Sequence, residues 1–214
     1  MRPMLRHGFA LTIALLLAAC ATAEPPPPPP LPTGPVLLDW KAIIRPVERG
    51  RLDRVDEAWA RALSQARGDG HEAELQALEP LTDPRAAQPD PAPPVGDYRC
   101  RTVKLGSQAE GGLSFIAYPW FKCRIEASPK GLKFVKLTGS QRPSGLLFPD
   151  TRRRMVLLGS LALGDEPAAN SYGLRPDRDL VAVLERLPHG GWRLAFPWPM
   201  AESNLDLIEL QPEG

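Results

Sequence analysis

The chain has 214 residues, with 26 lysines and arginines against 25 aspartates and glutamates. This balance excludes the strongly basic surface on which nucleic-acid-binding proteins depend, so we expect no nucleic acid among its partners. Prolines number 26, and their densest runs divide the chain into regions of different composition.

The first 19 residues have the features of a bacterial secretory signal of the lipoprotein type. Basic residues precede an apolar run over residues 9–17, which is too short to span a membrane. The Leu-Ala-Ala-Cys sequence that follows resembles a lipobox and predicts acylation of Cys20, with the chain anchored in the cell envelope. The residues after Cys20 favour the outer membrane, facing the periplasm. Cleavage after the A-x-A-like site at 21–23 is the alternative, and it releases a soluble periplasmic protein.

Residues 20–38 predict a spacer, because six consecutive prolines occupy positions 25–30. Proline fixes φ near −65° and lacks an N–H, so the segment favours polyproline II, which rises about 3.1 Å per residue. About 12 residues of this kind hold a domain roughly 35 to 40 Å from the membrane surface. A ligand for an aromatic groove on another protein is the alternative interpretation.

Residues 39–80 predict a helical hairpin. Asp39 is a suitable N-cap, Pro46 suits a first helical turn, and a second helix is expected over 71–79 after a stop at Gly68. Apolar residues recur three and four positions apart and share one helical stripe: Leu52, Val55, Trp59, Ala62, Leu63 and Ala66.

A proline-rich linker over 81–95 separates the helices from an antiparallel β domain over 96–212. Turn sequences divide this domain into about eight short strands, which favours an up-and-down barrel or a closed sandwich. The predicted fold is therefore α+β, with the helical hairpin packed on a barrel-like sheet. The predicted strands are 98–105, 113–126, 132–138, 145–148, 155–163, 179–187, 192–196 and 205–210.

Two predicted strands depart from simple alternation. Residues 180–184 are apolar throughout, so both faces should be covered, with the helices as the cover on one side. In residues 132–137 the apolar pattern shifts by one position, which suggests a β-bulge.

Cys100 and Cys123 are predicted to form a disulfide in an oxidising compartment. They are equidistant from Gly111 and Gly112, so a hairpin turning there places them directly opposite one another. On a chain-entropy estimate the bond is worth roughly 3 kcal/mol. A redox-active pair is the weaker alternative, because no C-x-x-C motif occurs.

Two segments combine aromatic residues with proline, which is unfavourable in a central strand. Tyr118, Trp120 and Phe121 belong to the first segment, and Phe196 and Trp198 to the second. One interpretation places them at a barrel rim, as a mouth for an apolar ligand or as a surface for a protein partner. The other makes the tryptophans a plug of core residues at a barrel end.

Few residues suggest chemistry. Arg142, in a polar segment over 138–145, is a candidate anion ligand, with a plain connection as the alternative. His71 and His189 lack metal-ligand spacing, and we expect neither a metal nor a cofactor. A carboxylate site built from Asp165, Glu166, Asp177 and Asp179 is the less favoured alternative. Catalytic residues are not apparent, because no hydrolase, metalloprotease or nucleotide-binding motif is present.

Four segments together resemble a bacterial family catalogued as domain of unknown function 4893. They are residues 96–107, 117–123, 137–143 and 195–199. The resemblance covers residues 39–210, and it implies no activity, cofactor or catalytic residue.

The sequence thus favours a non-enzymatic, lipid-anchored envelope protein that binds an apolar small molecule inside or at the mouth of its barrel. A periplasmic protein partner or inhibitor is the alternative. A hydrolase with unrecognised carboxylates is a third and weaker interpretation.

Overall fold

Eight antiparallel strands close into a barrel in the computed structural model, which describes residues 39–213. Each strand pairs with its neighbours in sequence, and the last strand pairs with the first. This up-and-down closure confirms the predicted α+β fold and removes every open sheet edge. The strands are β1 (Gly96–Leu105), β2 (Phe115–Ser128), β3 (Gly131–Lys136), β4 (Gln141–Pro149), β5 (Arg154–Leu163), β6 (Asp179–Arg186), β7 (Trp192–Pro197) and β8 (Leu205–Pro212).

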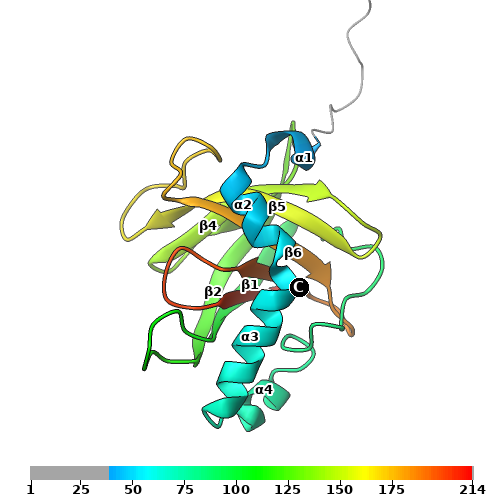
Figure 1. Cartoon of the computed structure of the whole chain (residues 1–214). Coiled ribbons are helices and arrows are strands. Elements are labelled where there is room, and N and C mark those ends of the chain that lie inside the picture. Colours follow the sequence, from blue (N-terminus) through cyan, green and yellow to red (C-terminus); the bar gives the residue numbers. More distant parts are fainter. Residues whose placement is uncertain (1–38, 214) are drawn as a thin grey trace, which may run out of the picture. The chain divides into compact units, whose positions relative to one another are not determined.

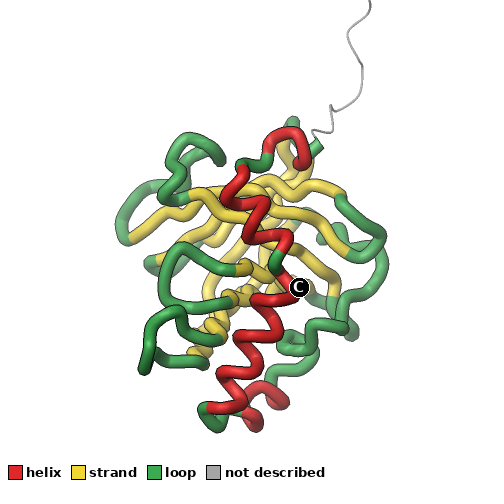
Figure 2. The backbone as a smooth tube through the Cα atoms, in the orientation of Figure 1, coloured by secondary structure: helices red, strands yellow, loops and turns green. Residues whose placement is uncertain are grey.

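Four helices precede the barrel and lie along one side of it (Figures 1 and 2). Asp39 caps the first helix, because its Oδ1 accepts a hydrogen bond of 2.9 Å from the N–H of Lys41. The predicted apolar stripe is present, but the helix that carries it is broken at Arg54, whose φ of −106° and ψ of 24° depart from helical values. The helices are α1 (Trp40–Ile43), α2 (Pro46–Asp53), α3 (Val55–Gly68) and α4 (Glu72–Ala77).

Two apolar clusters join the helices to the outside of the barrel. Trp40 and Leu52 pack with Val181 and Val183 of β6, which confirms that both faces of this strand are covered. The second cluster joins α3 to β1, β7 and β8. It includes Ala58, Trp59, Ala62, Leu63, Val103, Ala195, Leu205 and Leu207. The described helices include none long and apolar enough to cross a membrane.

A third cluster fills much of the barrel interior. Alternate residues of each strand point inward, as the pleat requires. The cluster includes Tyr98, Cys100, Cys123, Ile125, Phe134, Leu147, Leu157, Leu184, Trp192, Leu194, Ile208 and Leu210.

The disulfide between Cys100 and Cys123 is present, and both cysteines lie inside the barrel. The predicted register is wrong, because Cys100 pairs with Phe121 and Cys123 pairs with Tyr98. The bond therefore joins diagonal neighbours on β1 and β2, with 5.9 Å between the Cα atoms, which is within the usual range.

The bulge predicted for 132–137 is also wrong, since β3 pairs without interruption along β2 and β4. A bulge occurs in β2 instead, where Tyr118 and Pro119 together face Thr102 of β1. This position suits proline, which has no N–H to donate to a neighbouring strand.

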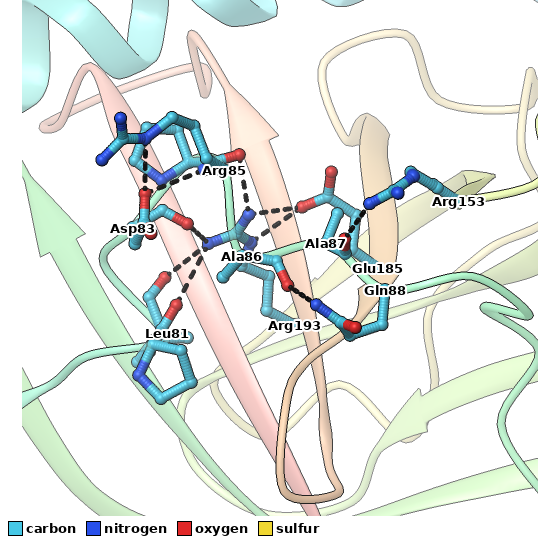
Figure 3. Close-up of polar contacts among 11 residues, drawn as sticks. Leu81, Asp83, Arg85, Ala86, Ala87, Gln88, Arg153, Glu185 and Arg193 are labelled. Atoms are coloured by element: carbon cyan, nitrogen blue, oxygen red, sulfur yellow. Dashed lines mark hydrogen bonds and ion pairs between the residues drawn. The ribbon is translucent and has the colours of Figure 1, made fainter.

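Arg193 of β7 binds the proline-rich segment over 81–95 to the outside of the barrel through hydrogen bonds. Figure 3 shows the guanidinium among backbone carbonyls of this segment, with Glu185 on its other side. It donates to the carbonyls of Leu81 at 2.9 Å and Asp83 at 2.6 Å, and its Nε donates to Glu185 at 2.8 Å. The Trp59 ring lies 4.6 Å from the guanidinium carbon, so Arg193 also joins α3 to the barrel.

Candidate functional site

The two ends of the barrel differ in how they are filled. At one end Tyr98 and Trp192 pack edge to face with their ring centroids 6.0 Å apart, and the interior is closed. The other end is hollow and is bordered by the β1–β2, β3–β4, β5–β6 and β7–β8 connections. We call the hollow of about 340 Å³ at this end the mouth cavity.

Apolar side chains form most of the mouth cavity's wall, and a few charged groups interrupt them. The apolar part comprises Pro143, Leu161, Leu163, Leu180, Phe196, Pro199, Met200, Ala201 and Ile208. The polar part comprises Thr102, Lys104, Gln141, Asp177, Arg178, Glu202 and Asp206.

Lys104 and Asp206 form the centre of the polar part because β1 and β8 place them directly opposite one another. The Lys104 Nζ is 3.9 Å from the Asp206 Oδ2 and donates to Gln141 Oε1 at 3.1 Å. It also donates to Glu202, whose side chain reaches in from the β7–β8 connection. Lys104 is only 5% exposed, so this cation depends on its protein partners in place of water.

Burial and charge act together on these groups. Burial raises the pKa of Asp206 to about 6, although the charge of Lys104 and the hydroxyl of Ser203 oppose this change. Burial lowers the pKa of Lys104, but the charges of Asp206 and Glu202 outweigh it, so the pKa of this lysine is raised overall. Lys104 therefore stays charged near neutral pH.

A second buried lysine lies beside the first. Lys136 of β3 is 5% exposed, donates to the carbonyl of Gln141 at 2.8 Å, and lies 4.0 Å from the centre of the Phe121 ring. Burial lowers the pKa of Lys136 to about 8 together with the charges of the neighbouring cations Arg142 and Lys104, burial being the largest cause. Lys136 is thus a buried cation in a positively charged neighbourhood.

Lys136 lines a smaller hollow of about 80 Å³, which we call the lysine pocket. Its wall consists of Thr102, Lys104, Tyr118, Phe121, Lys136, Ser140 and Gln141. Thr102, Lys104 and Gln141 also line the mouth cavity, so the two hollows are neighbours across these three residues.

Arg178 adds a further cation at the mouth. Its Nη1 is buried and has no hydrogen-bond partner among the described residues. The other nitrogens lie near carboxylates, with Nη2 at 3.4 Å from Glu166 and Nε at 3.5 Å from Asp177.

The aromatic residues predicted to form one rim are divided between the inside and the outside of the barrel. Tyr118 and Phe121 line the lysine pocket, and Phe196 lines the mouth cavity. Trp120 lies on the outer face, with the guanidinium carbons of Arg99 and Arg101 at 4.6 and 4.8 Å from its ring centre.

Trp198 also lies outside the barrel, where its Nε1 donates to the carbonyl of Arg54 at 3.1 Å. It therefore packs on the junction between α2 and α3 and does not plug a barrel end. A role of any of these aromatic residues in binding stays a prediction.

Arg142 is in β4, so the loop predicted for 138–145 ends earlier than expected. Its guanidinium donates to the carbonyls of Gly139 at 2.9 Å and Gly164 at 2.5 Å, and to that of Glu166. These bonds join the β3–β4 connection to the β5–β6 connection and use three of the five N–H groups of the guanidinium.

The histidines considered for metal binding lie in different parts of the fold, and carboxylates considered with them pair with arginines. His71 stacks on Phe115 near α4, and His189 is in the turn between β6 and β7. Asp179 is bonded to Arg45 at 3.0 Å, and Asp177 to Arg175 at 2.8 Å. Over residues 39–213, no group of three or more His, Cys, Asp or Glu side chains is arranged to hold a metal ion.

Lys104, Lys136 and Asp206 are the site residues that sequence reasoning missed. The alternation of inner and outer side chains along a strand could have identified the two lysines. Counting from Phe134 places Lys136 on the inner face of β3, and counting from Cys100 places Lys104 on the inner face of β1. Charged residues at the inner positions of short strands indicate a part of the barrel interior that apolar side chains do not fill.

The sequence model of one protein family, described as "Domain of unknown function (DUF4893)", matches residues 40–210. The chain belongs to the DUF4893 family. This match spans the four helices and all but the last two residues of β8, so the mouth cavity and the lysine pocket lie wholly within the DUF4893 region. No curated protein and no solved structure matches the chain.

Proposed function

We propose that this protein binds a small, mainly apolar molecule in the mouth cavity. The observation that carries the proposal is a hollow of about 340 Å³ inside a closed barrel, with apolar walls and a few buried polar groups. This volume is within the range of small-molecule sites, and buried polar groups of this kind orient a ligand.

The contrast between the barrel ends supports this proposal. An eight-stranded barrel is just wide enough for its own side chains to fill, as Tyr98 and Trp192 do at the closed end. At the mouth, Lys104 and Asp206 occupy inner positions where apolar residues would pack without the cost of burying charge. Charged groups beside an apolar hollow fit a binding site better than a structural core.

The proposed location is the cell envelope, with a lipid on Cys20 as the anchor and the periplasm as the compartment. This part of the proposal depends on the sequence, since residues 1–38 lie outside the described part of the chain. The disulfide between Cys100 and Cys123 is consistent with an oxidising compartment.

Native mass spectrometry tests the proposal directly. We suggest the complete chain with Cys20→Ser, which lacks the predicted acylation site, and the same chain with Leu161→Trp. Leu161 lines the cavity and is partly exposed, so a larger ring at this position fills the hollow at small cost to the fold. Leu174→Trp is the matched control, because Leu174 is 68% exposed in the β5–β6 connection.

We expect a non-covalent adduct that disappears on denaturation, is retained in Leu174→Trp and is lost in Leu161→Trp. A bare mass in every preparation, together with no binding of added decan-1-ol, would contradict the proposal.

A protein partner remains the second proposal, and Trp120 favours it. Trp120 is 39% exposed and lies between two arginines on the outer face of β1 and β2. Tryptophan and arginine are the residue types that dominate binding energy at protein interfaces. A pull-down from envelope extracts should yield a partner that Trp120→Ala loses and Lys122→Ala retains. Equal recovery with both variants argues against this surface.

A further inference from the structure

Lys136 differs from Lys104 and Arg178, because no carboxylate pairs with it in the described part of the chain. Lys104 contacts Glu202 and Asp206, and Arg178 lies near Glu166 and Asp177. Among the described residues, none of the ion pairs includes Lys136, whose one hydrogen bond goes to the carbonyl of Gln141. An ammonium group has three N–H donors, so two of them lack a protein acceptor here.

Further residues with hydrogen-bond donors line the lysine pocket. They are Lys104 and the hydroxyl-bearing residues Thr102, Tyr118 and Ser140. The charges near enough to act on Lys136 are those of Arg142 and Lys104, both positive. A small hollow with several donors and a net positive neighbourhood is complementary to an anion.

The charge expected of that anion follows from the protein groups that already contact the cations around the lysine pocket. Lys104 is neutralised by Glu202 and Asp206, and Arg142 is bonded to three carbonyls. Lys136 and Arg142 pair with no carboxylate among the described residues, so the three cations Lys104, Lys136 and Arg142 and the two carboxylates leave one net positive charge. One negative charge therefore matches the pocket, and two exceed it.

We propose that the molecule bound in the mouth cavity is an amphiphile with a single carboxylate, which pairs with Lys136 in the lysine pocket while its apolar part lies between Leu161, Phe196 and Ile208. The inference rests on the proposed function and names the chemical class of its ligand. Thr102, Lys104 and Gln141 border both hollows, so the two hollows adjoin, and the head group of one molecule is assigned to the lysine pocket and its apolar part to the mouth cavity.

Calorimetric titration with matched probes tests this inference. The probes are decanoate, decan-1-ol and decyl phosphate, which share one apolar chain and differ in the charge of the head group. The proteins are the complete chain with Cys20→Ser and the same chain with Lys136→Met or Lys133→Met. Lys133 is the matched control, since it is in the same strand and alternation places its side chain on the outer face.

We expect the parent chain to bind decanoate about tenfold to a hundredfold more tightly than decan-1-ol, the range of one charge-assisted pair. Lys136→Met should remove this preference and leave the affinity for decan-1-ol within about threefold. Lys133→Met should change neither value. Decyl phosphate should bind no more tightly than decanoate, because its second charge has no partner.

The outcomes separate the two proposals. Equal binding of decanoate and decan-1-ol by the parent chain, or a preference that survives in Lys136→Met, overturns the carboxylate inference and leaves the cavity as an apolar site. Decyl phosphate binding much more tightly than decanoate overturns the assignment of a single charge. If the parent chain binds none of the probes, the proposed function fails as well. Near-ultraviolet circular dichroism confirms that each variant is folded.

Discussion

Burying a lysine costs folding free energy, because the ammonium group loses its water. Lys136 retains one hydrogen bond and a contact with the Phe121 ring, and burial still lowers its pKa to about 8. Proteins keep such unfavourable groups where function requires them, so stability and binding should respond in opposite directions at this residue.

Lys136→Met should therefore make the protein more stable at pH 7, by about 1 to 3 kcal/mol in the free energy of unfolding. The folded pKa of about 8 lies below the ordinary value of 10.5, so the neutral form is favoured by folding. The wild type loses stability as the pH falls from about 10.5 to about 8, where the unfolded chain binds the proton and the folded protein does not. The advantage of the variant is then complete below pH 8 and disappears near pH 10.5.

Urea unfolding at pH 7 and pH 10.5 measures this difference. Lys133→Met is the control and should change stability by no more than about 0.5 kcal/mol at either pH, as expected for a surface substitution. An advantage of Lys136→Met that is the same at both pH values would show that the buried charge is not its cause.

Elements were easier to predict than the positions of their side chains. All eight strands were identified, since Gly- and Pro-containing turns separate short apolar segments. The interior charges were missed because Leu137, which is exposed, suggested a shifted apolar pattern in β3 and hid the inner position of Lys136. The break at Arg54 was also missed, because local sequence does not show how a helix must bend to follow a curved barrel.

The segment over 81–95 also shows that local sequence does not reveal the tertiary contacts of an element. Its composition predicts a linker, yet the buried Arg193 binds several of its carbonyls. These bonds satisfy backbone groups that neither a helix nor a strand satisfies. Arg193, far away in sequence, thus supplies part of the order that the segment cannot generate by itself.

Arg193→Met should destabilise the protein by about 3 kcal/mol or more, because it removes a buried guanidinium that is the donor to the partly buried Glu185 and to several backbone carbonyls. Arg153→Met is the matched control, since Arg153 donates to Ala87 of the same segment at 2.7 Å from an exposed position. The control should cost no more than about 1 kcal/mol. Urea unfolding gives both values, and protease cleavage within 81–95 should increase in Arg193→Met alone. Equal effects of the two variants would contradict the role assigned to Arg193.

The disulfide should stabilise the β1–β2 pair even though the barrel also holds these strands together. A bond across 23 residues restricts the unfolded chain and is worth about 3 kcal/mol on the loop-entropy estimate. The double variant Cys100→Ala and Cys123→Ala should lose about this amount in urea unfolding. Reduction with dithiothreitol should destabilise the parent chain and leave the double variant unchanged. Two free thiols in the unfolded, non-reduced protein would refute the bond itself.

At the scale of the whole molecule, the packed core and the proposed binding site lie at opposite ends of the barrel. The closed end holds an aromatic pair, and Trp192 there also donates to the carbonyl of Pro91 at 2.9 Å. The mouth end holds the cavity and the buried charges. The helices pack on the outer surface of the barrel (Figure 1). Residues of the strands and of their connections line the mouth cavity.

This division predicts that substitutions at the two ends have opposite effects. Trp192→Ala should cost about 3 to 5 kcal/mol, as large-to-small changes in a core do, while the folded protein keeps its affinity for decan-1-ol within about twofold. Leu161→Trp should cost less than about 1.5 kcal/mol, because the ring enters an existing hollow, and it should abolish binding. Urea unfolding and calorimetry on the same preparations provide both quantities. If Trp192→Ala weakened binding as strongly as Leu161→Trp, the closed end would be part of the site, and the ligand would extend through the barrel.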